Sequence, residues 1–157
     1  MFKTVVLGLD GSPEAKQALP FALELAEPET GRIIAVHVRE LLVGRAGGQP
    51  LVANEDEVEA EVRQEVDRIA ATGVDIKLAI VTTTAGGPAH VIADTARREN
   101  ADLIVVGTRG QGQVAGLLLG SVTHRLLHIA PCPVFAVPTR NAKSADQDIA
   151  GATASVG

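Results

Sequence analysis

Residues 103–130 read LIVVGTRGQGQVAGLLLGSVTHRLLHIA and decide how the rest of the chain is interpreted. Five residues without a polar side chain end on Gly107, a glycine-rich turn follows, and an amphipathic pattern begins after Gly120 and Ser121. This order predicts a buried strand, a loop and a helix N-terminus. Glycine lets the backbone approach an anion closely, and the free N–H groups at a helix start favour negative charge. The stretch therefore predicts a phosphate-binding loop, with a flexible glycine connector as the alternative.

The rest of the chain alternates short β-rich runs with helical patterns. We predict strands at residues 3–9, 32–38, 74–81, 103–107 and 133–138, and helices starting near residues 13, 55, 88 and 121. Such alternation predicts an α/β fold with a parallel sheet and right-handed crossovers. The length of 157 residues fits one domain. Residues 139–157 are small and polar without apolar periodicity, which predicts a disordered tail.

Local signals mark the ends of these elements. Ser12 followed by Pro13 is typical of the N-cap and first position of a helix. Residues 41–53 contain three glycines and a proline and predict a long irregular loop. Residues 55–68 hold seven acids and two arginines, a net charge of −5, and are expected to form a helix with a solvated acidic face. The apolar stripe of that helix is Val58, Val62, Val66 and Ile69, and Gly73 is expected to follow its end.

Composition argues against several classes of function. The whole chain has a net charge of −5, so the remainder is neutral and offers no basic patch for nucleic acid. Trp and Tyr are absent, which removes the usual platform for stacking bases. No apolar run approaches the ~20 residues that span a bilayer. A single cysteine, Cys132, and no signal-peptide pattern at the start lead us to expect a cytoplasmic protein.

Three residues at predicted strand ends are candidates for a site. Asp10 follows the first strand, Val38 ends the second, and Gly107 ends the fourth. Open α/β sheets bind ligands at the carboxyl ends of strands, where the winding reverses. If the first and fourth strands are neighbours, Asp10 faces the glycine loop. Its carboxylate then either accepts from ribose hydroxyls or caps the first helix, a role that Ser12 fills better.

Three segments carry a resemblance to a known family. They are VVLGLDGSPEA at 5–15, AVHV at 35–38, and residues 101–138, which contain the spacing G-2x-G-9x-G-S/T. In these segments the chain resembles the universal stress protein family, of the single-domain type that binds ATP. The likeness covers residues 2–138, so we expect one such domain over residues 1–138. The glycine signature falls on Gly107, Gly110, Gly120 and Ser121.

The resemblance implies a fold, a ligand and an assembly. The fold would be a five-stranded parallel sheet of order 3-2-1-4-5 with helices on both faces, which is Rossmann-like. The ligand would be ATP, with Mg²⁺ on its phosphates. The assembly would be a homodimer through the last strand, Val134–Val137. The residues implied to bind the nucleotide are Asp10 and Val38 at the adenosine, Val106 and Gly107 at the sugar and base side, and Gly110, Gly120, Ser121 and Val122 at the phosphates.

We predict no catalytic residue and no metal ligand. The sequence shows no nucleophile, base and acid in a recognisable set, so any hydrolysis should be slow. His124 and His128 share a helix face, but Pro131 interrupts the helix before Cys132 completes it. The leading hypothesis is an ATP-binding regulatory protein of the stress response, acting on a protein partner that the sequence does not identify. The alternatives are a slow ATPase or phosphotransferase, and a dimeric interaction module that ignores nucleotide.

Overall fold

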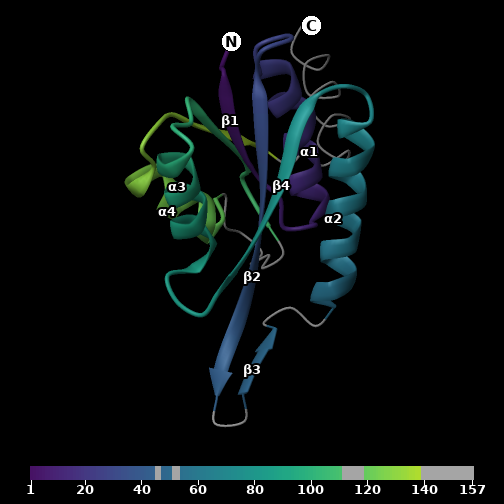
Figure 1. Cartoon of the computed structure of the whole chain (residues 1–157). Coiled ribbons are helices and arrows are strands. Elements are labelled where there is room, and N and C mark those ends of the chain that lie inside the picture. Colours follow the sequence, from purple (N-terminus) through teal and green to yellow (C-terminus); the bar gives the residue numbers. More distant parts are fainter. Residues whose placement is uncertain (45–46, 51–53, 111–118, 139–157) are drawn as a thin grey trace, which may run out of the picture.

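The computed structural model of the protein describes residues 1–44, 47–50, 54–110 and 119–138. Its central parallel sheet is built from β1 (Thr4–Gly8), β2 (Arg32–Gly44), β4 (Asp75–Thr83), β5 (Leu103–Gly107) and β6 (Val134–Val137). These strands lie in the order β4-β2-β1-β5-β6 (Figure 1). Counted along the chain, the parallel strands follow the order 3-2-1-4-5. The predicted fold is therefore confirmed.

The register places the ends of β1 and β5 beside each other. Val6 of β1 lies opposite Ile34 of β2 on one side and Ile104 of β5 on the other. The chain winds from β1 toward β2 and β4, and later returns on the other side of β1 to form β5 and β6. The crevice at this reversal point is where open α/β sheets bind ligands. Asp10 and the start of the glycine loop therefore emerge at the same edge, as the sequence predicted.

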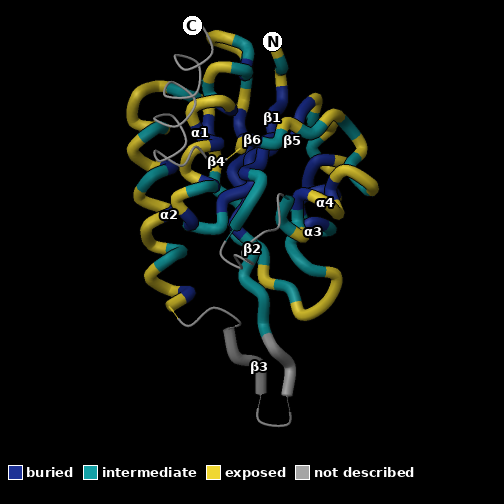
Figure 2. Tube along the Cα trace, turned by 180° about the vertical axis from the view of Figure 1, so that it is seen from behind, coloured by how far each residue is buried: buried dark blue, intermediate teal, exposed yellow. Residues whose placement is uncertain are grey.

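Two helices cover each face of the sheet. The helices α1 (Pro13–Leu25) and α2 (Glu55–Ala70) lie on one face, and α3 (Gly87–Arg98) and α4 (Ser121–Ile129) lie on the other (Figure 1). Alternate residues of each strand pack on the two sides: Val5 and Leu7 join the core under α1 and α2, whereas Val6 joins the core under α3 and α4. Figure 2 shows that the buried residues concentrate in these central strands. Both faces are apolar, which explains the continuously apolar runs of the sequence.

The helix signals predicted from the sequence are confirmed. Ser12 is the N-cap of α1, its side chain accepts from the Ala15 N–H at 3.1 Å, and Pro13 is the first helical residue. On α2, Val62 and Val66 are buried, while Val58 and Ile69 pack beside them. Gly73 follows α2 with a φ of +94°, a conformation that side-chain-bearing residues rarely adopt.

The prediction for the end of β2 was wrong. The strand does not stop at Val38 but continues to Gly44 and pairs antiparallel with β3 (Gly47–Pro50), within the segment predicted to be irregular. Leu41, Leu42 and Val43 favour an extended strand, and the glycines on either side of the turn favour a tight reversal. Figure 1 shows this hairpin extending beyond the body of the sheet. The rest of that segment (45–46 and 51–53), residues 111–118 of the glycine loop and the predicted tail at 139–157 lie outside the described residues.

Candidate functional site

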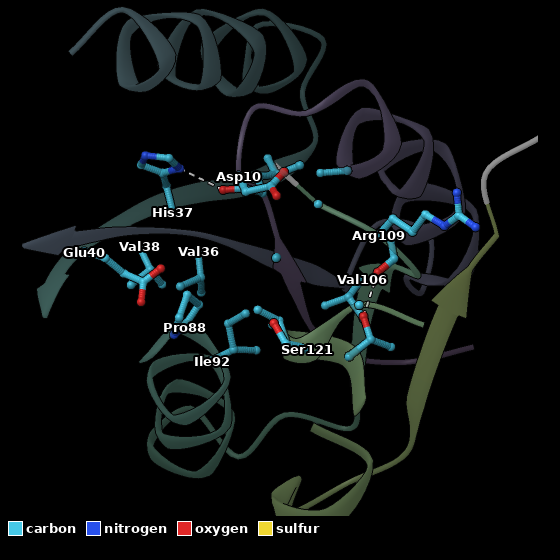
Figure 3. Close-up of a pocket in the computed structure, with 18 of the residues that line it drawn as sticks. Asp10, Val36, His37, Val38, Glu40, Pro88, Ile92, Val106, Arg109 and Ser121 are labelled. Carbon is cyan, nitrogen blue, oxygen red and sulfur yellow. Dashed lines mark hydrogen bonds between the residues drawn. The ribbon is translucent and has the colours of Figure 1, made fainter. Parts of the chain in front are cut away.

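A cavity of about 510 Å³ lies at the carboxyl ends of β1 and β5 and beside the middle of β2. Its size falls within the range of small-molecule sites, roughly 300–1,000 Å³. It is bordered by strand ends and by the N-terminal turns of α3 and α4 (Figure 3). The structure brings to this one cavity all of the residues predicted to bind nucleotide: Asp10, Val38, Val106, Gly107, Gly110, Gly120, Ser121 and Val122.

The N-terminus of α4 forms one end of the cavity. Gly120 is the N-cap and contributes no side-chain hydrogen bond, so the N–H groups of the first turn are not capped from within the helix. The buried Thr123 hydroxyl donates to the Gly107 carbonyl at 2.8 Å and fixes the helix against the end of β5. The Gly120 N–H donates to the Thr108 carbonyl at 2.6 Å. This end of the cavity is therefore suited to hold an anion.

Close backbone approaches explain two glycines of the signature. A Cβ atom on Gly110 would overlap the Asp10 carboxylate, and a Cβ on Gly107 would lie 3.1 Å from the carbonyl oxygens of Arg109 and Glu14. Any larger residue at these positions would displace backbone or the carboxylate. These glycines therefore bring the loop against Asp10 and the first turn of α1, which a merely flexible connector would not require.

Asp10 both organises α1 and lines the cavity. Its Oδ1 accepts from the Ser12 N–H at 3.0 Å and from the Ser12 hydroxyl at 2.6 Å, and Ser12 in turn caps the helix. Asp10 thus supports the capping residue rather than capping α1 itself. Its carboxylate lies between the α4 end and the β2 end of the cavity, facing Gly110 (Figure 3). Of the two sequence interpretations, the role of helix cap belongs to Ser12, and the position of Asp10 at the cavity is compatible with a ligand contact.

The other end of the cavity is apolar. Val36 and Val38 project from the same face of β2, and Pro88 and Ile92 come from the first turns of α3 (Figure 3). The sequence analysis included Val38 but missed the other three. Period-two alternation along β2 could have identified Val36, whereas the contribution of α3 depends on how that helix packs. An apolar slot of this kind suits a planar, weakly polar group.

A buried His–Glu pair lies behind the β2 end of the cavity. His37 is 2% exposed and Glu55 is 4% exposed. The His37 Nδ1 lies 2.8 Å from the Leu9 carbonyl, and its Nε2 lies 2.6 Å from the Glu55 Oε1. Because a carbonyl oxygen only accepts, the His37 Nδ1 carries a proton. The contact between Nε2 and the Glu55 Oε1 requires a second proton, on one of these two atoms. The pair ties the end of β1 to the start of α2.

This pair corrects one prediction about the acidic helix. The sequence analysis placed the acids of residues 55–68 on a solvated face, which holds for residues such as Asp56 and Glu57 but is wrong for Glu55. The acid packs inward because His37 offers it a partner from the neighbouring strand. His37 stands within an apolar run, and the sequence between the two residues gives no signal that they meet.

Charge is distributed unevenly around the cavity. The carboxylate of Glu40 lies at the β2 end, where Glu55 is paired with His37, whereas the positive end of the α4 dipole lies at the other. Arg109 also borders the cavity, but its guanidinium extends away from the other labelled residues in Figure 3. Anionic groups of a ligand should therefore lie at the α4 end.

The described residues contain no group of three His, Cys, Asp or Glu side chains placed to hold a metal ion. The His124 and His128 rings lie 4.9 Å apart on the exposed face of α4, and the His128 Nδ1 donates to the His124 carbonyl. None of the described helices is both long and apolar enough to cross a membrane.

Cys132 lies outside the cavity, and its surroundings predict low reactivity. The pKa of this thiol is raised above its ordinary value. The main cause is burial, and the second is the negative charge of Asp102. Because the thiolate is the nucleophile, alkylation by iodoacetamide at neutral pH should be slower than that of N-acetylcysteine, and its rate should rise at higher pH. Mass spectrometry of the alkylated chain across a pH series would measure this. A rate equal to that of the free thiol would contradict it.

The comparisons with known proteins agree on one family. The model of the Universal stress protein family matches residues 1–138. A universal stress protein of Thermus aquaticus is 38% identical over 139 residues, which cover 87% of this chain and 99% of that protein. The crystal structure of a universal stress protein in complex with cAMP superposes with a TM-score of 0.64 at 28% identity, covering 88% of this chain and 98% of that one.

A further solved structure supports the fold alone. It is the universal stress protein from Archaeoglobus fulgidus in complex with dAMP, with a TM-score of 0.60 at 24% identity, and it covers 87% of this chain and 98% of that one. The family model matches residues 1–138, and the alignment with the Thermus aquaticus protein covers 87% of this chain and 99% of that protein. The chain belongs to the universal stress protein family.

Proposed function

We propose that the cavity binds ATP, with the phosphates at the N-terminus of α4 and the adenine beside Val36 and Val38 of β2. The observation that carries this proposal is the convergence of Gly107, Gly110, Gly120 and Ser121 on one helix N-terminus whose N-cap residue has no side chain, directly opposite Asp10. Backbone N–H groups and the Ser121 hydroxyl are suited to phosphate oxygens. A related protein that binds cAMP supports an adenine nucleotide as the ligand.

The cavity also offers suitable contacts for the ribose and the adenine. The ribose would lie at Asp10, whose carboxylate accepts from hydroxyl groups, and the adenine would lie between the Val36–Val38 face and Ile92. Mg²⁺ would reach the site on the phosphates, because it is commonly held by phosphate oxygens and water with few protein ligands. Within the described residues we assign no protein ligand to it.

We further propose that nucleotide occupancy regulates contacts with a protein partner in the stress response. ATP shifts an equilibrium between two states only if it binds them with different affinity. The segments 41–53 and 108–119 are our candidates for the partner-binding residues. We propose a cytoplasmic protein, with residues 139–157 as a tail outside the domain.

The identity of the ligand can be tested on the purified full chain. Denaturing the protein and chromatographing the released small molecules should yield an adenine nucleotide, and calorimetric titration should give micromolar binding of Mg·ATP. Titrations with ADP, AMP and cAMP separate recognition of the phosphate chain from recognition of adenosine alone. Equal affinities for all four ligands would contradict a role for the glycine loop in holding the triphosphate. A time course of ADP release in the same samples tests the alternative of slow hydrolysis.

We also propose a homodimer through β6. This strand is the last of the parallel sheet and pairs on one side with β5. Phe135 of β6 is 40% exposed, and its ring lies 5.7 Å from that of Phe21 on α1, which is 39% exposed. An edge strand beside exposed aromatic rings is suited to pair with a second copy, in an isologous contact.

Phe135→Asp should convert this dimer to a monomer. The change places a charge at the proposed contact, where desolvating it without a partner is costly. Sedimentation equilibrium of the wild type and the variant measures the result. Ala60→Asp adds the same charge to an exposed position of α2, beside the β2 and β4 half of the sheet, and should leave the dimer intact. A wild type that stays monomeric, or a dimeric Phe135→Asp variant, would contradict this interface.

A further inference from the structure

Glu40 occupies the end of the cavity farthest from the glycine loop. It follows Val36 and Val38 on the same face of β2, because successive side chains of a strand alternate between faces. It therefore lies roughly 7 Å beyond Val38 along the strand. Its Oε1 lies 3.8 Å from the position that a Cβ on Gly87 would occupy, so the carboxylate reaches the start of α3. Figure 3 shows Glu40 beside Val38 and Pro88, across the cavity from Ser121.

The Glu40 carboxylate is available to a ligand. Within the described part of the chain it has no hydrogen-bond or ion-pair partner, although it is half-buried. The neighbouring cation, Arg39, points to the opposite face of β2, where it binds Asp56 at 2.8 Å and Glu59 at 3.0 Å. Glu40 is thus an acceptor at the cavity wall that no described basic side chain neutralises.

We propose that Glu40 selects a 6-amino purine over a 6-oxo purine, by accepting a hydrogen bond from the exocyclic amine of adenine. This inference rests on the proposed function, which places the base at the β2 end. An ionised carboxylate only accepts, and the 6-amino group only donates there. Hypoxanthine and guanine present a carbonyl oxygen at the same position, so two acceptors would face each other. Discrimination of this kind comes from leaving buried polar groups unpaired in the wrong complex.

The same carboxylate also fixes the orientation of the nucleotide. A phosphate chain at the Glu40 end would meet the negative charge of Glu40, whereas the α4 end offers a positive dipole. The base and the phosphates therefore have one favourable arrangement. Selection and orientation follow from a single side chain that lies outside the glycine signature.

The test compares Mg·ATP with Mg·ITP, which carry the same charge and differ at the 6-position of the base. Calorimetric titration of the wild type should show ATP binding roughly 10- to 100-fold tighter than ITP, as expected for one hydrogen bond to a charged group. In Glu40→Gln this ratio should fall to nearly one, because an amide offers either a carbonyl or an N–H₂ group. The change in net charge affects both nucleotides equally and cancels in the ratio.

Glu24→Gln is the matched control, because Glu24 is exposed on α1 and does not line the cavity. It should keep the wild-type ratio. ATP and ITP binding equally to the wild type, or a ratio that Glu40→Gln leaves unchanged, would overturn the inference while the proposed function stands. A wild type that binds neither nucleotide would overturn the proposed function and this inference with it.

Discussion

Gly120→Leu should weaken binding of Mg·ATP by roughly 100-fold or more, because at least two charge-assisted hydrogen bonds to phosphate would be lost. The backbone at Gly120 is extended, with φ −69° and ψ 157°, so leucine is sterically allowed there. Its Cβ would lie 3.1 Å from the Thr108 carbonyl, and the rest of the side chain would occupy space beside the first turn of α4. The substitution therefore acts on the cavity and should leave the sheet folded.

Calorimetric titration measures the affinity of this variant, and circular dichroism confirms that it is folded. Gly73→Leu provides the matched control: Gly73 follows α2 outside the cavity, and a Cβ there would meet nothing within 4 Å. The positive φ of Gly73 should make that variant somewhat less stable, while its ATP affinity should remain that of the wild type. Undiminished ATP binding by a folded Gly120→Leu protein would show that the phosphates do not lie at this helix N-terminus.

His37→Leu should lower the free energy of unfolding by about 3–5 kcal/mol, the usual cost of removing one member of a buried ion pair. The change leaves Glu55 buried without its partner and removes the donor to the Leu9 carbonyl. Small domains have a total stability of roughly 5–15 kcal/mol, so a loss of this size is a large fraction of it. Urea unfolding, followed by circular dichroism, measures the change.

Two controls separate the effect of breaking the buried pair from the effect of simply removing a charged side chain. The double variant His37→Leu/Glu55→Leu should recover much of the lost stability, because replacing both charged partners with apolar residues is far less costly than removing one. Lys16→Met removes the exposed ion pair with Glu61 and should cost about 0–1 kcal/mol. If His37→Leu costs no more than Lys16→Met, the buried pair does not contribute to the stability of this fold.

Much of the fold could be predicted because its signals are local. Apolar runs marked the parallel strands, and the Ser12–Pro13 pair marked the start of α1. The glycine spacing pointed to residues that line the cavity, since Gly107, Gly110 and Gly120 have a recognisable pattern before any contact is known. The strand order, by contrast, came from the family resemblance, because periodicity alone does not say which strands are neighbours.

The features that were missed depend on contacts between distant segments. His37 and Glu55 meet because β2 and the start of α2 pack together, and their separation along the chain gives no fixed spacing to recognise. Pro88 and Ile92 line the cavity because of how α3 lies on the sheet. The extension of β2 was missed because glycine and proline in a row of this kind usually indicate a loop, whereas here Gly44 and Gly47 flank a hairpin turn.

The most direct test of the proposed site is a crystal structure of the full chain with Mg·ATP. The account predicts electron density for the phosphates beside Gly110, Gly120 and Ser121, the ribose at Asp10, and the base between Val38 and Ile92 with its amine toward Glu40. A nucleotide in the reverse orientation, or one bound outside this cavity, would contradict the account.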